Sequence, residues 1–427
     1  MPADVKQSSL IPMLIIGTLF FIFGFVTWLN GSLIPFLKVI CDLNDFQALF
    51  VTFAFYIAYT TMAYPMSFIL TKTGYKKGMA IGLGIMAVGA LLFIPAAFSA
   101  DFLIFLAALF TLGSGLTILQ TASNPYIVLI GPTESAAMRI SIMGVVNKGA
   151  GIIAPLVFTA LIFSDLSLFS KEVLSGAEIE LLASKLIVPY LVMAAILTGL
   201  IFLVLFSSLP EIEFNEAEED EAKTHIFHYP QVVLGAVALF AYVGVEVVAG
   251  DTIGLFGQTL GVANFTALTS YTMVFMVMGY LVGVAAIPKY LSQERALIYS
   301  AVGGTLTIVA LLFSSSESSA ISNVLWGWSG IATIPDPVAL VALLGLSHAL
   351  VWPAIWPLAL QGLGKFTAQG SALLIMSIAG GALIPLVFGQ ATELGGDMQF
   401  AYAVTLPCYL FIFFYALKGH KIKRWQR

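Results

Sequence analysis

Three ionisable side chains lie inside long apolar stretches of the sequence: Lys148, Glu246 and Asp251. A charge within an apolar span is rare and costly, so each of the three is a candidate for a functional role. A lone ammonium in such a place would either lose its proton or require a carboxylate partner. We therefore predict that Lys148 pairs with Glu246 or Asp251, either for ion coupling or as a static salt bridge between two halves of the protein.

The two acids are five residues apart, which is about 140° around a helix. Only one of them should therefore face a central cavity, unless the helix breaks near Gly250. A carboxylate among backbone carbonyls could bind sodium, whereas a desolvated carboxylate could exchange a proton. The residues alone leave proton and sodium open, and they leave any metal unknown.

Side-chain amides lie in the apolar stretches of the first half, at Asn30, Gln120, Asn124 and Asn147. An amide both donates and accepts hydrogen bonds, as recognition of a hydroxylated ligand requires, so we predict a binding role for all four. Gln120 and Asn124 share one helix face at i and i+4. Asn124 precedes a proline and could instead bond backbone groups left free there, and Asn147 could instead hold a neighbouring helix.

A second stripe consists of His348, Trp352 and Trp356, at i, i+4 and i+8. Indole rings pack against the apolar face of a pyranose, and the histidine could form a hydrogen bond or titrate. The alternatives are an interfacial anchor for the tryptophans and a core position for the histidine. Trp28 lies beside Asn30, and we expect it to be a packing residue.

Membrane-spanning helices must position these side chains, because 59% of the 427 residues are hydrophobic and only 10% are charged. An ordinary soluble domain has about 25% charged residues. Twelve apolar stretches reach the roughly 20 residues that a helix needs to cross a bilayer. They form two groups of six, at 11–37, 47–70, 78–99, 102–131, 138–164 and 186–208, then 231–260, 265–289, 296–314, 336–361, 368–391 and 398–418.

The basic residues predict the orientation. Of the 18 Lys and Arg, 14 fall in loops on the side of the termini, three fall on the opposite side, and Lys148 is inside a span. The positive-inside rule therefore predicts that both termini are cytoplasmic. We divide the chain into a first six-helix bundle (1–208), an acidic solvated linker (209–229) and a second bundle (230–427) with a basic tail.

Two pairs of segments suggest an internal repeat. Residues 148–158 resemble residues 378–388, and residues 24–32 resemble residues 244–252 more loosely. The pairs lie in the fifth and the first span of each half, as expected for two related bundles with a binding site between them. Chance similarity between apolar helices is the alternative for both pairs. The looser alignment matches Asp251 with Gly31.

Several motifs carry a family resemblance: residues 21–38, Gln120-Thr-Ala-Ser-Asn-Pro-Tyr126 with Ile130-Gly-Pro132, and Leu360-Gln-Gly-Leu-Gly-Lys365 with Gln369-Gly-Ser371. Together they resemble the fucose/glucose-galactose (sugar:cation) symporter family of the major facilitator superfamily. The chain looks nearest to the glucose/galactose and N-acetylglucosamine permeases, and Trp-Leu-Asn-Gly favours the latter. The resemblance implies twelve helices and uptake of a monosaccharide coupled to protons or sodium.

The sequence departs from the fucose branch of that family at both of its acids. That branch has an acid directly after the Asn of the first helix, where this chain has Gly31, and a second acid where it has Gln120. The fucose mechanism therefore cannot be transferred whole, and fucose is not the expected substrate. We hypothesise that the coupling carboxylate has moved to Asp251 in the pseudo-symmetric helix.

The fifth helix keeps the resemblance only in part. The polar pair of the fucose branch falls here on Ser141 and Gly144. Lys148 follows them at i+7 on the same stripe, so it shares the face that the family turns to the sugar.

Other classes of protein lack support in the sequence. We find no His-Glu-x-x-His, Gly-x-Ser-x-Gly or P-loop motif that would indicate an enzyme, and no filter-like loop that would indicate a channel. An uncoupled sugar facilitator and a multidrug or metabolite exporter of the same fold remain alternatives.

The expected fold class is an all-α polytopic membrane protein with the major facilitator fold, its twelve helices in two pseudo-symmetric six-helix bundles. We expect a monomer in the bacterial inner membrane that imports a hexose or an N-acetylhexosamine by alternating access. Its expected partners are the sugar, a proton or sodium ion and the lipid bilayer. No cofactor and no nucleic acid is expected.

Overall fold

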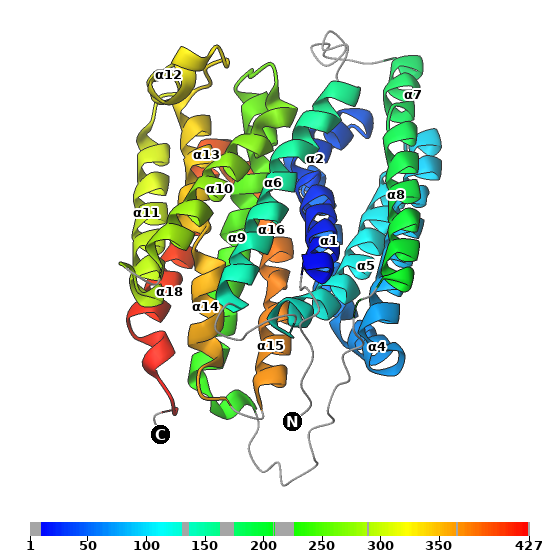
Figure 1. Cartoon of the computed structure of the whole chain (residues 1–427). Coiled ribbons are helices and arrows are strands. Elements are labelled where there is room, and N and C mark those ends of the chain that lie inside the picture. Colours follow the sequence, from blue (N-terminus) through cyan, green and yellow to red (C-terminus); the bar gives the residue numbers. More distant parts are fainter. Residues whose placement is uncertain are drawn as a thin grey trace.

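A computed structural model of the chain describes residues 10–129, 136–162, 175–207, 209, 226–287, 290–363 and 366–425. All regular secondary structure within these ranges is helical (Figure 1). The helices of the first half are α1 (Leu10–Trp28), α2 (Asn30–Ile40), α3 (Asp45–Ala48), α4 (Phe50–Ser99), α5 (Phe102–Leu129), α6 (Ala136–Ile162), α7 (Gly176–Ser184) and α8 (Ile187–Phe206).

The second half of the chain, after residue 229, is also helical. Its helices are α9 (Pro230–Thr259), α10 (Leu268–Ala286), α11 (Gln293–Phe313), α12 (Ala320–Trp326), α13 (Asp336–His348), α14 (Val351–Leu360), α15 (Thr367–Met376), α16 (Gly380–Gly395), α17 (Met398–Ala401) and α18 (Leu406–Leu417). Short 3-10 turns include η4 (Phe265–Ala267), η7 (Ser377–Ala379) and η8 (Tyr402–Thr405).

The described helices provide 12 segments that are long and apolar enough to cross a bilayer. Each segment overlaps one of the twelve predicted spans, so the prediction of an all-helical, polytopic membrane protein is confirmed. The predicted turn at 131–134 lies outside the described residues.

The second and third predicted spans are the two arms of one helical element, α4. The chain reverses at Gly74, whose φ of 78° lies in the left-handed region that glycine adopts without steric cost. One arm of α4 therefore comprises residues 50–73, and the other returns over residues 75–99.

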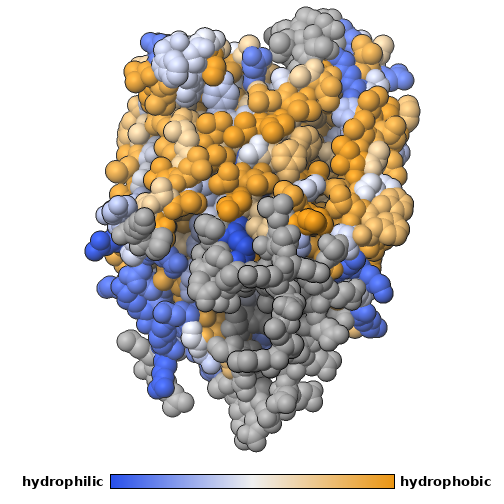
Figure 2. Space-filling view, in the orientation of Figure 1, coloured by the Kyte–Doolittle hydropathy of each residue, from blue (hydrophilic) through white to orange (hydrophobic). Residues whose placement is uncertain are grey.

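The outer surface carries a broad apolar band (Figure 2). Mid-helix side chains such as Phe202 and Leu306 are 57% and 64% exposed. In water such a surface would aggregate, whereas in a bilayer it faces lipid tails while the helices satisfy their own backbone hydrogen bonds.

The two ends of the bundle differ in charge. The end that holds the start of α9 and the tail, here called the basic end, carries Lys72, Lys76, Lys77, Arg139, Arg295, Lys418, Lys421, Lys423 and Arg424. Trp425 Nε1 donates to the Phe227 carbonyl there (2.7 Å), and Lys76 Nζ donates to the Ser207 carbonyl (2.7 Å).

The opposite end, here called the acidic end, holds most of the described carboxylates: Asp42, Asp45, Asp101, Glu178, Glu180, Glu317, Asp336, Glu393 and Asp397. Its described basic residues are Lys38, which pairs with Asp45 (2.5 Å), and Lys185. Figure 1 shows α7 and α12 at this end.

Three spans are interrupted near their middle. The first changes from α1 to α2 at Leu29, the tenth breaks between His348 and Val351, and the eleventh passes through the 3-10 turn η7. Breaks at this depth are tolerated where the backbone lines a cavity or is buried in protein.

One close contact recurs in both halves. A Cβ atom on Gly24 of α1 would lie 2.7 Å from the Asn147 carbonyl carbon of α6. A Cβ on Gly244 of α9 would lie 2.7 Å from the Ile384 Cβ atom of α16. The loosely matched glycines of the first and seventh spans thus each pack against the fifth span of their own half, although the contacted residues, Asn147 and Ile384, are not matched with each other in the repeat.

Substitution of Gly24 by alanine should destabilise the protein by about 1–3 kcal/mol, because the new methyl group meets backbone that cannot move aside. The matched control is Gly199→Ala in α8, where a Cβ meets nothing within 4 Å. That variant should be neutral or gain up to about 1 kcal/mol of helix propensity. Thermal unfolding of the purified proteins in detergent compares them, and equal melting temperatures would contradict the close approach of α1 and α6.

Candidate functional site

A cavity of about 160 Å³ lies between the two halves. This volume is below the roughly 300–1,000 Å³ of pockets for drug-sized ligands, so it suits a small molecule. Helices α1, α4, α5 and α6 supply one wall, and α9, α10, α14 and η7 supply the other. The lining residues are Phe20, Phe23, Thr27, Trp28, Tyr56, Tyr59, Gln120, Ile127, Ile140, Ser141, Gly144, Asn147, Lys148, Tyr242, Val243, Glu246, Val247, Tyr280, Trp352, Pro353 and Ile378.

An ion pair crosses the cavity from one half to the other. Lys148 Nζ of α6 lies 2.7 Å from Glu246 Oε1 of α9, and the two side chains are 10% and 9% exposed. Of the two acids predicted as partners of Lys148, the structure therefore pairs it with Glu246. At this depth the pairing avoids the large penalty of a lone buried charge.

Trp28 also contacts the ammonium group of Lys148. Lys148 Nζ lies 4.1 Å from the centroid of the Trp28 ring, at cation–π distance. The indole is 2% exposed, and a Cβ on Gly151 would come within 2.6 Å of it. Trp28 is thus a packing residue, as expected, but it also contacts the ion pair, which sequence reasoning missed.

Two of the predicted amides reach the cavity. Gln120 Nε2 donates to the Tyr59 hydroxyl (3.0 Å), and Asn147 Nδ2 donates to the Phe20 carbonyl of α1 (3.3 Å). Both side chains line the cavity, and their carbonyl oxygens make no hydrogen bond to the described part of the chain. Each amide is therefore oriented by a protein partner and keeps an acceptor for a ligand. Asn147 also holds the neighbouring helix, the alternative considered for it.

The other two amides lie elsewhere. The backbone of Asn124 belongs to α5, but its side chain lies outside the described part of the structure. Asn30 opens α2, is 2% exposed, and does not line the cavity. Its Nδ2 has no hydrogen-bond partner among the described residues. The binding roles of both residues stay predictions.

The predicted stripe in the tenth span is divided by the break between α13 and α14. Trp352 lines the cavity, with its ring 6.4 Å from Tyr242 and 5.6 Å from Trp356. His348 is fully buried behind the cavity wall, where its Nε2 lies 2.7 Å from the Tyr409 hydroxyl. In this conformation neither His348 nor Trp356 reaches the cavity, so their roles in ligand binding stay predictions.

Asp251 is separated from the ion pair, as the 140° angle predicted. Glu246 lines the cavity, whereas Asp251 is 0% exposed and does not. Thr52 Oγ1 of α4 donates to Asp251 Oδ2 (3.0 Å) across the interface between the halves.

The structure explains the missing acid at position 31. A Cβ on Gly31 would lie 2.7 Å from the Gly250 carbonyl oxygen and would collide with the Thr269 side chain. Helices α2 and α9 touch at this position, and the space for a carboxylate is absent. In this conformation the close packing of α2 against α9 therefore requires glycine at position 31, where the fucose branch has an acid.

Sequence reasoning missed four tyrosines of the cavity wall: Tyr56, Tyr59, Tyr242 and Tyr280. All are buried, and they add phenol groups to a wall that also holds the two amides and the ion pair. Tyrosine in the middle of an apolar span was the available signal, but aromatic residues are so frequent in this chain that the signal is weak.

The cavity is closed towards the acidic end. Ser32 Oγ donates to the Thr266 carbonyl (2.5 Å), Thr159 and Thr266 hydroxyls lie 2.9 Å apart, and Ser270 Oγ donates to the Ile152 carbonyl (2.7 Å). These bonds join the two halves on the acidic side of Lys148. The lining extends the other way, to Ile127 and Ile140 near the basic end of α5 and α6.

A polar cavity between two helical bundles, closed at one end and buried at mid-membrane depth, defines a membrane transporter rather than an enzyme. Comparison with known proteins gives the family. The Major Facilitator Superfamily matches residues 16–387, and the chain belongs to that superfamily.

Several relatives align over nearly the whole chain. The glucose/galactose transporter of Brucella abortus is 33% identical, over 94% of this chain and 92% of its own. The L-fucose-proton symporter of Escherichia coli is 27% identical, over 97% and 94%. A crystal structure of the E. coli fucose:proton symporter shares the fold, with a TM-score of 0.71 and 24% identity over 96% of this chain and 98% of that one.

Removal of one partner of the ion pair should destabilise the protein more than removal of both. Lys148→Met and Glu246→Gln each leave an unpaired buried charge or polar group, at a cost of about 3–5 kcal/mol for a charge. The double variant leaves no unpaired charge, only a neutral amide at position 246, so it should unfold closer to wild type. Melting temperatures of the four proteins form a double-mutant cycle, and additive losses would show that the two side chains do not interact.

Proposed function

We propose that the protein imports a neutral hexose or N-acetylhexosamine by alternating access, coupled to a proton or sodium gradient. The main observation is the cavity between the halves, where oriented amides and the half-buried indole of Trp352 line a space for a small ligand. The names of the relatives support a sugar, and those of the fucose relatives support protons.

Gln120, Asn147 and Trp352 form the first set of sugar contacts in this proposal. The two amides offer acceptors to sugar hydroxyls, and the indole offers a flat apolar surface to the ring. Asn124, Asn30, His348 and Trp356 are candidates for contacts made in other conformations of the cycle. Lys148 and Glu246 neutralise each other beside the sugar, and Asp251 is a candidate for the ion site.

The proposed orientation puts the basic end in the cytoplasm. Nine described Lys and Arg residues lie at that end and two at the acidic end, which is the bias that the positive-inside rule requires. Both termini are then cytoplasmic, and the closed acidic end of the cavity faces the outside. We further propose two six-helix domains, 1–208 and 230–427, joined by an acidic linker, in a monomer of the bacterial inner membrane.

Uptake in proteoliposomes tests the proposal. Radiolabelled glucose, galactose, N-acetylglucosamine and fucose are supplied with an inward proton gradient or an inward sodium gradient. We expect accumulation of one or more of the first three sugars under one of the gradients. Equilibration without accumulation would instead indicate a facilitator, and absence of any sugar flux would contradict the proposal and favour an exporter.

Replacement of Gln120 by alanine should weaken sugar affinity by roughly 10- to 100-fold, because a buried hydroxyl of the sugar would lose its partner. Asn323→Ala is the control, since this amide is exposed in α12, far from the cavity. The concentration dependence of exchange measures both. Equal affinity in the two variants would remove Gln120 from the sugar site.

A further inference from the structure

Asp251 is a fully buried carboxylate with an incomplete set of partners. It is 0% exposed, and its Oδ2 accepts one hydrogen bond, from Thr52 Oγ1 at 3.0 Å. Its Oδ1 has no hydrogen-bond partner in the described part of the chain. The described residues also give it no Lys, Arg or His at ion-pair distance, since Lys148 is committed to Glu246.

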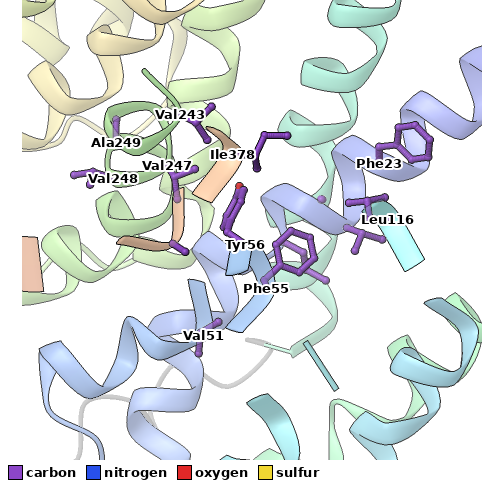
Figure 3. Close-up of a cluster of buried hydrophobic side chains, with 14 of the residues drawn as sticks. Phe23, Val51, Phe55, Tyr56, Leu116, Val243, Val247, Val248, Ala249 and Ile378 are labelled. Atoms are coloured by element: carbon purple, nitrogen blue, oxygen red, sulfur yellow. The ribbon is translucent and has the colours of Figure 1, made fainter. Parts of the chain in front are cut away.

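The interface around Thr52 and Asp251 is largely apolar. Val51 and Phe55 of α4 and Val247, Val248 and Ala249 of α9 belong to one buried apolar cluster (Figure 3). A negative charge on the fully buried Asp251 would be both desolvated and unpaired, which is strongly unfavourable.

Few titratable groups face the site. Tyr56 of α4 lies close to Asp251, and Glu246 is five residues earlier on α9 with its charge balanced by Lys148. Tyr402 of η8 contacts the neighbouring Thr252 (2.8 Å) rather than the carboxylate. These groups offer Asp251 no compensating positive charge.

The described residues give Asp251 one hydrogen-bonding oxygen, that of Thr52, whereas a metal ion needs a larger set of ligands. Thr252 Oγ1 donates to the Val248 carbonyl (2.6 Å), and Thr269 Oγ1 donates to the Gly250 carbonyl (2.8 Å). A hard cation in a protein is held by about six or more oxygen ligands, and no cluster of three metal-binding side chains occurs among the described residues. A proton needs only the one free oxygen.

We propose that Asp251 carries the coupling proton on Oδ1 and that Thr52 is the residue that positions it, so that closure at the acidic end requires a protonated Asp251. This inference rests on the proposed sugar transport and names its ion. Because α4 and α9 belong to different halves, the bond between Thr52 and Asp251 can form only when the halves are closed at that end.

The cycle follows from this geometry. When the two halves separate at the acidic end, Asp251 becomes exposed to water and takes up a proton from that side of the membrane. Closure then buries a neutral acid. Tyr56 lies one turn after Thr52 on α4 and lines the cavity, so it marks the side towards which the proton is released. The charged carboxylate that remains favours reopening at the acidic end.

The test separates proton coupling from sugar movement. Equilibrium exchange of labelled hexose in proteoliposomes needs no gradient, whereas accumulation needs one. We expect Asp251→Asn to keep exchange, to lose proton-driven accumulation and sugar-induced proton uptake, and to lose the pH dependence of exchange. Asp42→Asn is the matched control, because Asp42 is exposed at the acidic end, and it should behave as wild type.

Thr52 is tested by a second pair of variants. Thr52→Val should displace the pH profile of exchange, and Thr52→Ser, which keeps the hydroxyl, should restore it. Thr159→Val removes another hydrogen bond of the same closure without touching Asp251, and it should leave the pH profile unchanged.

The outcomes distinguish this inference from the proposed function. Proton-driven accumulation by Asp251→Asn, or accumulation by wild type under sodium alone, would overturn the inference and leave sugar transport standing. An unchanged pH profile in Thr52→Val would overturn the role of Thr52. Absence of hexose exchange in wild type would contradict the proposed function itself.

Discussion

The cost of placing charge in a low-dielectric interior determines how this molecule is built. Lys148 and Glu246 come from different halves, and each is acceptable at mid-membrane depth only while the other is near. The pair therefore joins the halves at the cavity, and Trp28 shields the ammonium from the side. The neutral amides and tyrosines around it can then face a polar but uncharged ligand, because the local charges already cancel.

Much of the fold could be predicted from the sequence, because span length and apolar composition are enforced by the bilayer itself. The twelve spans and the pairing of Lys148 with an acid follow from that constraint. The stripe of His348, Trp352 and Trp356 was less informative, because i+4 spacing describes a side-chain stripe only along an unbroken helix, and this span breaks after His348. The reversal at Gly74 inside α4 depends on one backbone angle, which composition does not reveal.

The candidate site was harder to predict than the fold. Sequence reasoning identified Gln120, Asn147, Lys148, Glu246 and Trp352, all of which line the cavity, because polar groups in apolar spans are conspicuous. It could not tell cavity from core for Asn30 and His348, since either place accepts a polar side chain that finds a partner. Thr52 escaped notice because a single threonine in an apolar helix is ordinary, and its partner is 199 residues away in the chain.

The contact between α2 and α9 limits which substitutions position 31 can accept. The loose repeat matches Gly31 with Asp251, and the helices that carry these two positions touch there, with Gly31 against the Gly250 carbonyl. An acidic side chain at position 31 of α2 needs α9 to lie further away. That greater separation would expose Asp251 to its surroundings. In this packing the two arrangements are therefore mutually exclusive, so a related chain with an acid at position 31 must hold α9 further from α2.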